Sequence, residues 1–203
     1  EFVDGAEEVV DAADDALDVG TVITALLGTD VVIQATGDIN VNAALNAIHT
    51  SARTLTLEAG NQIAVNNEIS SSNAALTVNL TAASVDLAAN VNTNGGDLAI
   101  NSTGAITQTA GALSVTGTAT LAAGAANDIT LDAAGNQLGK VTLTSGKDVT
   151  LRNAAGLELG GGSVASLSVT ADGAITQSDA LAVTGTATLA AGAANDITLD
   201  AAG

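Results

Sequence analysis

The stretch Val115–Gly135 reads VTGTATLAAGAANDITLDAAG, and Val183–Gly203 repeats it without a single change. The match continues upstream, so the duplicated unit covers residues 104–135 and again 173–203. An identity of this length is an internal duplication, and duplicated units of this kind indicate stacked repeats. Within each copy apolar residues alternate with threonine, which is the period of a β-strand. The sequence therefore predicts a repetitive β structure.

A finer period of about 22 residues runs along the chain in tracks of aliphatic residues. The first track is Ile33, Leu55, Leu76, Leu98, Leu121, Leu143, Leu167 and Leu189. The second is Val41, Ile63, Val85, Ile106, Ile129, Leu151, Ile175 and Ile197. A looser third track is Leu45, Ile69, Val91, Leu113, Leu138, Leu159 and Leu181. Because the first two tracks lengthen and shorten together, we expect them to lie on successive turns of one object.

These runs are short and are separated by turns rich in Gly, Asn and Asp, such as Ala59-Gly60-Asn61. They predict an all-β fold, a parallel β-helix or β-solenoid of about eight coils with three short strands each. If each coil rises by one inter-strand spacing, the rod is roughly 40 Å long. The absence of Pro agrees, since central strands must donate their backbone N–H groups. Two β-sandwich domains are the alternative, but they do not explain a register shared by two tracks.

The composition excludes several classes of protein. The 203 residues carry 22 Asp and Glu against four Lys and Arg, which gives a net charge of −18 and no electrostatic footprint for nucleic acid. There is no Cys and only one His, so disulfides, thiol catalysis and multi-histidine sites are excluded. With 47% hydrophobic residues and a single aromatic, Phe2, the core must consist of aliphatic side chains. No apolar run is long enough to span a bilayer, so we expect no membrane insertion.

Residues 1–20 differ from the repeats that fill residues 21–203, because they are rich in acids. Asp4 and Glu7 have the spacing of a helix capping box, which predicts a short acidic helix, or a tail, that covers the first coil. The residues that would share one helical face are Val9, Val10, Ala13 and Leu17. A calcium-responsive segment is the less favoured alternative, since a helix spreads its acids around its circumference.

Paired carboxylates are the first candidates for chemistry, because some β-helix proteins cleave polysaccharides. Asp128 with Asp132, and Asp196 with Asp200, flank Ile-Thr-Leu in the two copies of the duplicated block. On one strand such acids stand about 13 Å apart, which is wide for a glycosidase pair. We therefore interpret them as polar surface and turn caps.

The remaining candidates are weaker. The one basic cluster, Lys140, Lys147, Asp148 and Arg152, lacks the aromatic platform that sugar-binding enzymes usually have. His49 is expected in a loop or facing outward. Gly160-Gly161-Gly162 and Gly95-Gly96-Asp97 resemble calcium-binding nonapeptide repeats only faintly, because neither recurs in tandem. We therefore predict no catalytic, cofactor-binding or metal-binding residues, no cofactor, and no enzyme activity.

Two non-enzymatic functions compete with a purely structural role. Threonines beside the first track could form an ice-binding array, but the residues that follow the track are interrupted by alanines. High β-propensity alone explains the threonine content. The ends of a solenoid expose unpaired strand edges, so the chain is either a piece of a longer rod, which we favour, or a filament subunit that associates end to end.

Stretches such as Gly37–Ala43, Leu55–Asn61 and Asp128–Gly135 resemble the repeats of filamentous haemagglutinin-type, two-partner-secreted adhesins, and so does Ile23–Ile33. The resemblance covers about residues 20–203. It implies a right-handed parallel β-helix that is secreted or displayed on the surface of a Gram-negative-type cell. We expect an extracellular structural or adhesive rod, the shaft of an adhesin. Its partners would be a host-cell, matrix or neighbouring-cell surface. A carbohydrate-active β-helix enzyme is the second alternative.

Overall fold

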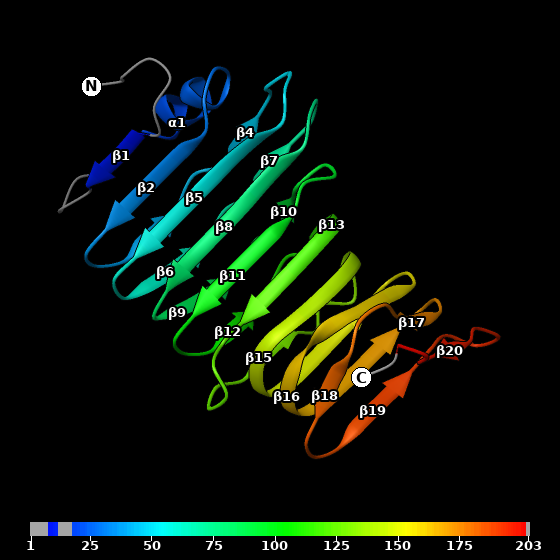
Figure 1. Ribbon diagram of the computed structural model, residues 1–203. Helices are drawn as coiled ribbons and strands as arrows, with labels where there is room; N and C mark the ends of the chain where they lie inside the picture. Colours follow the sequence, from blue (N-terminus) through cyan, green and yellow to red (C-terminus); the bar gives the residue numbers. More distant parts are fainter. Residues whose placement is uncertain (1–7, 12–17, 202–203) are drawn as a thin grey trace.

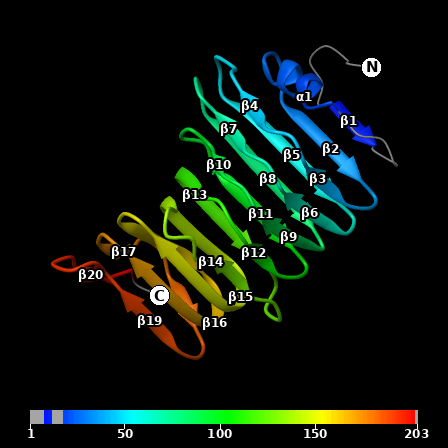
Figure 2. The ribbon, with the colours of Figure 1, turned by 180° about the vertical axis from the view of Figure 1, so that it is seen from behind.

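The protein is a β-solenoid in which every paired strand runs parallel to its neighbours (Figure 1). The computed structural model describes residues 8–11 and 18–201, and only the backbone of the first of these segments. Twenty strands join in one sheet that winds through about eight turns of about 22 residues. The predicted fold class is therefore confirmed. Seen from behind, the turns remain stacked along one axis (Figure 2).

The strands stack in three ladders. Ladder A contains β1 (Glu8–Asp11), β2 (Val31–Ala35), β5 (Arg53–Ala59), β8 (Leu76–Ala82), β11 (Leu98–Ser102), the end of β13 (Leu113–Ala122), the first halves of β15 (Gln137–Asn153) and β16 (Leu157–Ala171), β17 (Ile175–Gln177) and β20 (Ile197–Thr198). Ladder B contains β3 (Ile39–Val41), β6 (Gln62–Val65), β9 (Ser84–Leu87), β12 (Ile106–Gln108), β14 (Ile129–Leu131), the second halves of β15 and β16, and β19 (Ala187–Ala190). Ladder C contains β4 (Leu45–Ala47), β7 (Ile69–Ser71), β10 (Val91–Asn92) and the starts of β13 and β15, while β18 (Leu181–Val183) pairs with the bend of β16.

The interior is a column of aliphatic side chains from all three ladders. Along β8 the apolar residues Leu76, Val78 and Leu80 are at most 1% exposed, whereas Thr77 and Asn79 between them face outward. The buried residues form one continuous core from α1 to Ile175. Since burying a Leu or Ile side chain stabilises a fold by about 1.5–3 kcal/mol, this column is the main source of stability. A narrow and regular interior has no space that requires an aromatic ring.

The one helix among the described residues, α1 (Val19–Leu26), covers the N-terminal end of the column. Asp18 caps it, because its carboxylate accepts the N–H of Gly20 at 3.1 Å. The buried side chains of α1 belong to the core and pack against β2, β4 and β5.

The helix lies after the position that the sequence suggested. Val9 and Val10, expected on a helix, belong to β1 and pair with Val32 and Ile33. β-Branched residues favour a strand, and the edge of β2 offers a partner. Asp4, Glu7, Ala13 and Leu17 lie outside the described residues.

The second and third tracks are confirmed in the middle of the chain. Val85, Ile106 and Ile129 stand opposite one another on ladder B, as predicted. The third track is likewise correct for its first four members, Leu45 to Leu113. The first track is mostly displaced by two residues: Leu55 pairs with Val31 and Val78 rather than with Ile33 and Leu76. A shift of two leaves every side chain on the same face, so alternation alone cannot detect it.

The predicted register is wrong between β15 and the next turn, although Ile175 and Ile197 further along stand opposite each other as predicted. Leu143 stands opposite Gly162, not Leu167, and Leu151 stands opposite Val169, not Ile175. After Asn153 the chain returns directly to ladder A at Leu157 and omits the strand of ladder C. The turn is therefore shorter here, with Val141 opposite Leu159. The number of strands per turn thus departs from the predicted three at this point.

The omitted strand places the two copies of the duplicated block on different ladders. In the first copy, Ala119 stands opposite Val141 on ladder A and Ile129 opposite Val149 on ladder B. In the second copy, Ala187 pairs on ladder B and Ile197 on ladder A. The two strands of the block therefore lie on ladders A and B in the first copy, and on ladders B and A in the second.

Candidate functional site

Four aspartates directly before strands cap the next turn of the solenoid. In each case the carboxylate Oδ1 accepts a backbone N–H at the equivalent place one turn later. The bonds run from Thr54 to Asp30 (2.8 Å), from Gln62 to Asp38 (3.2 Å), from Thr118 to Asp97 (2.8 Å) and from Asp148 to Asp128 (3.3 Å). These bonds satisfy strand-end donors that the ladders leave unpaired. Asp128 is therefore a turn cap, as predicted, and Asp132, Asp196 and Asp200 are exposed on the outside.

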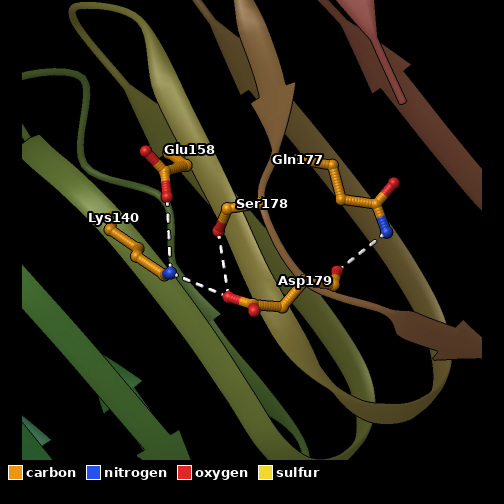
Figure 3. Close-up of polar contacts among 5 residues, drawn as sticks. All are labelled: Lys140, Glu158, Gln177, Ser178 and Asp179. Carbon is orange, nitrogen blue, oxygen red and sulfur yellow. Dashed lines mark hydrogen bonds and ion pairs between the residues drawn. The ribbon is translucent and has the colours of Figure 1, made fainter. Parts of the chain in front are cut away.

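Lys140 joins three successive turns by ion pairs (Figure 3). Its ammonium lies 3.3 Å from Glu158 on β16 and 2.8 Å from Asp179 after β17. The Ser178 hydroxyl donates to the same Asp179 carboxylate at 3.0 Å. On the same segment, the side-chain amide of Gln177 donates to the Asp179 backbone oxygen at 3.0 Å. These contacts form one polar column on the outer surface of the shortened turns. Its members are Lys140, Glu158, Ser178 and Asp179.

The electrostatics of this column keep its groups charged. The hydrogen bond to Asp179 raises the pKa of Lys140, and that same bond, with Ser178, lowers the pKa of Asp179. The Ser178 hydroxyl and then Lys140 lower the pKa of Glu158. A lysine held protonated is a poor general base, and carboxylates held ionised are poor general acids. The arrangement thus favours cross-turn pairing over proton transfer.

Lys147 forms a second, separate pair group at the bend of β15. Its ammonium lies 2.9 Å from Asp148 and 3.6 Å from Asp128 of the previous turn. The Ser166 hydroxyl donates to Asp148, and this bond, followed by Lys147, lowers the pKa of Asp148. Arg152 lies exposed on ladder B. The sequence cluster Lys140, Lys147, Asp148 and Arg152 is therefore distributed over two ladders and the bend between them.

His49 lies in the loop between β4 and β5, as one of the two predicted alternatives has it, but it is fully buried there and does not face outward. Its Nδ1 lies 2.7 Å from the Ser51 carbonyl oxygen, and its Nε2 lies 3.2 Å from the Ser71 hydroxyl. Since a carbonyl only accepts, Nδ1 carries the proton. The imidazole thus bonds to polar groups that lack a ladder partner where the chain turns from β4 to β5. The sequence alone gives no reason to expect this role.

Buried amides perform the same role further along the solenoid. Gln108 and Asn136 bond to each other through both amide groups, at 2.9 and 2.8 Å. Asn153 is also 0% exposed, and it accepts the Leu138 N–H at 2.7 Å and donates to the Leu138 carbonyl at 3.1 Å. It therefore occupies the place of the omitted ladder C strand. In the sequence, these contacts are indicated only by an amide residue at a strand position where the alternation predicts a buried apolar side chain.

Each of the two glycine motifs contains a glycine with a positive φ angle. Gly95 has φ +92° in the turn before β11, and Gly162, at φ +135°, lies against the Leu143 backbone. In the part of the chain that the structure describes, no group of three or more His, Asp or Glu side chains is placed to hold a metal ion. The only helix there has eight residues and cannot cross a membrane.

The threonine column is interrupted. Thr56 stands opposite Asn79, whose side chain donates to it at 3.3 Å, and not opposite Thr77. Hydroxyl groups therefore do not recur regularly from turn to turn at this point.

The geometry defines a β-solenoid built from sequence repeats, with its polar side chains used to join one turn to the next. The family described as Repeats of unknown function (DUF5649) matches residues 52–145 and 146–203. The chain belongs to this family. No curated protein and no solved structure matches the chain.

Proposed function

We propose that the protein is a shaft segment of a large secreted or surface-displayed adhesin of the filamentous haemagglutinin type. One observation carries the proposal: ladder A runs without interruption from β1 to β20 over an aliphatic core. A continuous parallel ladder makes every turn depend on its neighbours, and the resulting rod holds whatever it carries at a set distance. The role is mechanical, and its partner is a host-cell, matrix or neighbouring-cell surface.

The polar contacts of the outer surface support this role. Side chains on neighbouring turns bond to each other, as Asn42 does with Asn66 at 2.9 Å and Asn46 with Ser70 at 2.8 Å. Lys140 and Lys147 form ion pairs across turns in the same way, and the pKa shifts around Lys140 oppose proton transfer. For these reasons we favour a structural protein over a carbohydrate-active enzyme.

The rigidity of the shaft can be measured between two spin labels. The chain has no Cys, so Asn40→Cys and Ser168→Cys place labels at two exposed positions without side reactions. Both face outward on ladder B, six strand spacings apart, or about 29 Å. A rod gives a narrow distance distribution near this value. A broad distribution, or one centred well away from it, contradicts a rigid shaft.

Display outside the cell requires a separate experiment. An antibody raised against this chain should label intact source cells or their medium, and added protease should remove the cell-bound label. Labelling that requires cell permeabilisation contradicts the secreted location. A cytoplasmic marker protein, retained throughout, controls for cell lysis.

A self-assembling filament subunit is the second candidate, and one observation favours it. On the last described turn, Ile197 and Leu199 are 43% and 53% exposed, and an end-to-end contact between copies would bury them. Sedimentation at high protein concentration, in both low and high salt, tests this function. Because the net charge of −18 opposes association at low salt, a strict monomer in high salt excludes the filament.

A further inference from the structure

Two segments on neighbouring turns carry the pattern Asn-x-Thr. They are Asn79-Leu80-Thr81 on β8 and Asn101-Ser102-Thr103, which begins on β11 and ends just after it. These two strands lie side by side on ladder A (Figure 1). No other asparagine of the chain is followed by Ser or Thr at the second position. Since Asn-x-Ser/Thr is the acceptor pattern for N-linked sugars, both segments are candidate modification sites.

The second segment presents both of its recognition groups on the outer surface. Successive side chains of a strand point to opposite faces, and this alternation continues at the end of β11. Asn101 and Thr103 are exposed, whereas Ser102 between them is 4% exposed. The Ser102 hydroxyl is used inside, where it donates to the Ala83 carbonyl at 3.1 Å and accepts the Gly104 N–H at 3.1 Å. The amide and the hydroxyl of the pattern are therefore both open to solvent.

The Asn101 carboxamide is available for modification in the folded chain. Its side chain is exposed and makes no hydrogen bond among the residues that the structure describes. On the neighbouring strands it stands opposite Thr81 and Ala122, whose side chains are short and uncharged. A sugar on Asn101 would therefore extend into solvent without displacing a ladder bond or a core side chain.

Asn79 differs from Asn101 in two respects. It is only partly exposed, and its Nδ2 donates to the Thr56 hydroxyl of the preceding turn at 3.3 Å. It is also the central residue of β8, whereas Asn101 is one residue from the end of β11. Strand ends open locally more readily than strand centres. The structure therefore favours Asn101 over Asn79 as an acceptor.

We propose that Asn101 is the acceptor of an N-linked sugar, which a separate glycosyltransferase takes from a donor with a diphosphate group on its anomeric carbon. The Asn101 Nδ2 attacks this carbon, and the new C–N bond forms as the C–O bond to the phosphate breaks. The diphosphate leaves with the electron pair, and the amide nitrogen loses one proton to a base of the enzyme. The Thr103 hydroxyl is the second group that the enzyme recognises. This assignment rests on the proposed function, since N-linked sugars are typical of surface and secreted proteins.

The test starts from the chain purified from the surface or the medium of source cells. Cleavage before aspartate releases residues 97–127, which contain Asn101, and residues 38–85, which contain Asn79, so each pattern lies on its own peptide. Mass spectrometry should find one or more sugar residues on the first peptide, and fragmentation should locate them on Asn101. Occupancy should be about tenfold higher at Asn101 than at Asn79, because the centre of a strand opens less often than its end.

Variants separate recognition by the enzyme from effects on the fold. Asn101→Gln retains an exposed amide and should lose the sugar completely. Thr103→Ala leaves Asn101 in place and should also lose it, whereas Thr103→Ser restores a hydroxyl and should retain it. The matched control Asn79→Gln should leave the sugar on residues 97–127 unchanged. Circular dichroism checks that all four variants keep the strand content of the parent chain.

Two extracts of the source cells distinguish the possible donors. The unmodified chain is incubated with the soluble fraction and UDP-glucose, or with the membranes alone, which hold lipid-linked sugars. Transfer to Asn101 in the first mixture identifies a nucleotide-linked donor, and transfer in the second identifies a lipid-linked donor. Either result supports the assignment, and transfer to Asn79 alone contradicts it.

Three results with the purified chain would overturn the assignment. They are a displayed chain with no sugar on residues 97–127, a sugar that persists in Thr103→Ala, and equal occupancy of Asn79 and Asn101. The first of these leaves the shaft function intact. Conversely, a chain that stays inside the cell and carries the sugar on Asn101 would contradict display but support the acceptor site.

Discussion

Leu131 and Leu199 provide a matched pair of mutations within one molecule. They occupy the same position in two identical sequences, so their neighbours along the chain are the same. Leu131 is 0% exposed and stands opposite Leu151, whereas Leu199 is 53% exposed on the last turn. Truncating each leucine to alanine therefore measures the tertiary environment with the local sequence held constant.

The expected costs follow from burial. Leu→Ala removes three carbon atoms, and at about 0.8 kcal/mol per buried CH₂ the transfer contribution is about 2.4 kcal/mol for Leu131. The cavity adds to this, because core Leu→Ala substitutions cost about 2–5 kcal/mol in total. Leu199 has lost more than half of its burial already, and its site is open. Its truncation should therefore cost about 1 kcal/mol or less.

Equilibrium unfolding in urea measures both costs. The chain has no Trp or Tyr, so far-ultraviolet circular dichroism replaces fluorescence. We expect Leu131→Ala to lower the midpoint strongly at an unchanged slope, and Leu199→Ala to leave it near that of the parent chain. If the two free-energy losses agree within about 0.5 kcal/mol, the two copies do not differ in burial, and the assignment of β19 and β20 to the last turn is wrong.

Three further predictions concern polar contacts and backbone. Asn153→Leu should cost about 1–3 kcal/mol, because the buried Leu138 N–H loses its acceptor, and amide exchange at Leu138 should accelerate. Asn101→Ala, at an exposed position of β11, is its control and should change stability by less than about 0.5 kcal/mol. Gly162→Ala should cost more than about 2 kcal/mol, because φ is +135° and a Cβ would collide with the Leu143 backbone, whereas Gly37→Ala meets nothing and should be tolerated in thermal melts. The pKa of Asp179 is lowered by Lys140, so this contribution is present at neutral pH and is lost as the pH falls through the folded-state pKa. The melting temperatures of the parent chain and Lys140→Gln should therefore converge as the pH falls below about 4, the ordinary pKa of an Asp carboxyl; a constant difference would contradict the pairing.

The alternation of side chains along a strand explains which features of the fold could be predicted from the sequence. Inward positions were predictable because Val, Leu and Ile recur every second residue, and Leu55 and Leu76 are indeed buried. Their partners were not predictable, because a slip of two residues conserves the face of every side chain. Leu55 accordingly pairs with Val78. The predicted register failed where the intervals between track residues were longest, at Leu143 and Leu151.

The candidate site illustrates a different limit. Asp128 was correctly interpreted as a turn cap, since an acid directly before a strand is well placed to accept a backbone N–H. His49 and Asn153 were missed as structural elements, because a buried polar side chain depends on which backbone groups lack a partner nearby. Those groups become defined only when separate turns are stacked.

The sequence by itself determined that this protein is a stack of β-strand coils with an aliphatic interior. Period-two alternation, a period of about 22 residues, the absence of Pro and the presence of only one Phe, Tyr or Trp residue leave few other ways to bury so many Val, Ile and Leu side chains. Only the tertiary structure decided which ladder each copy of the duplicated block joins. Ala119 lies on ladder A, and its identical counterpart Ala187 lies on ladder B. The reason is that Ala, Leu and Ile fit the interior of either ladder equally well, so the strand omitted after Asn153 sets the position of every residue that follows.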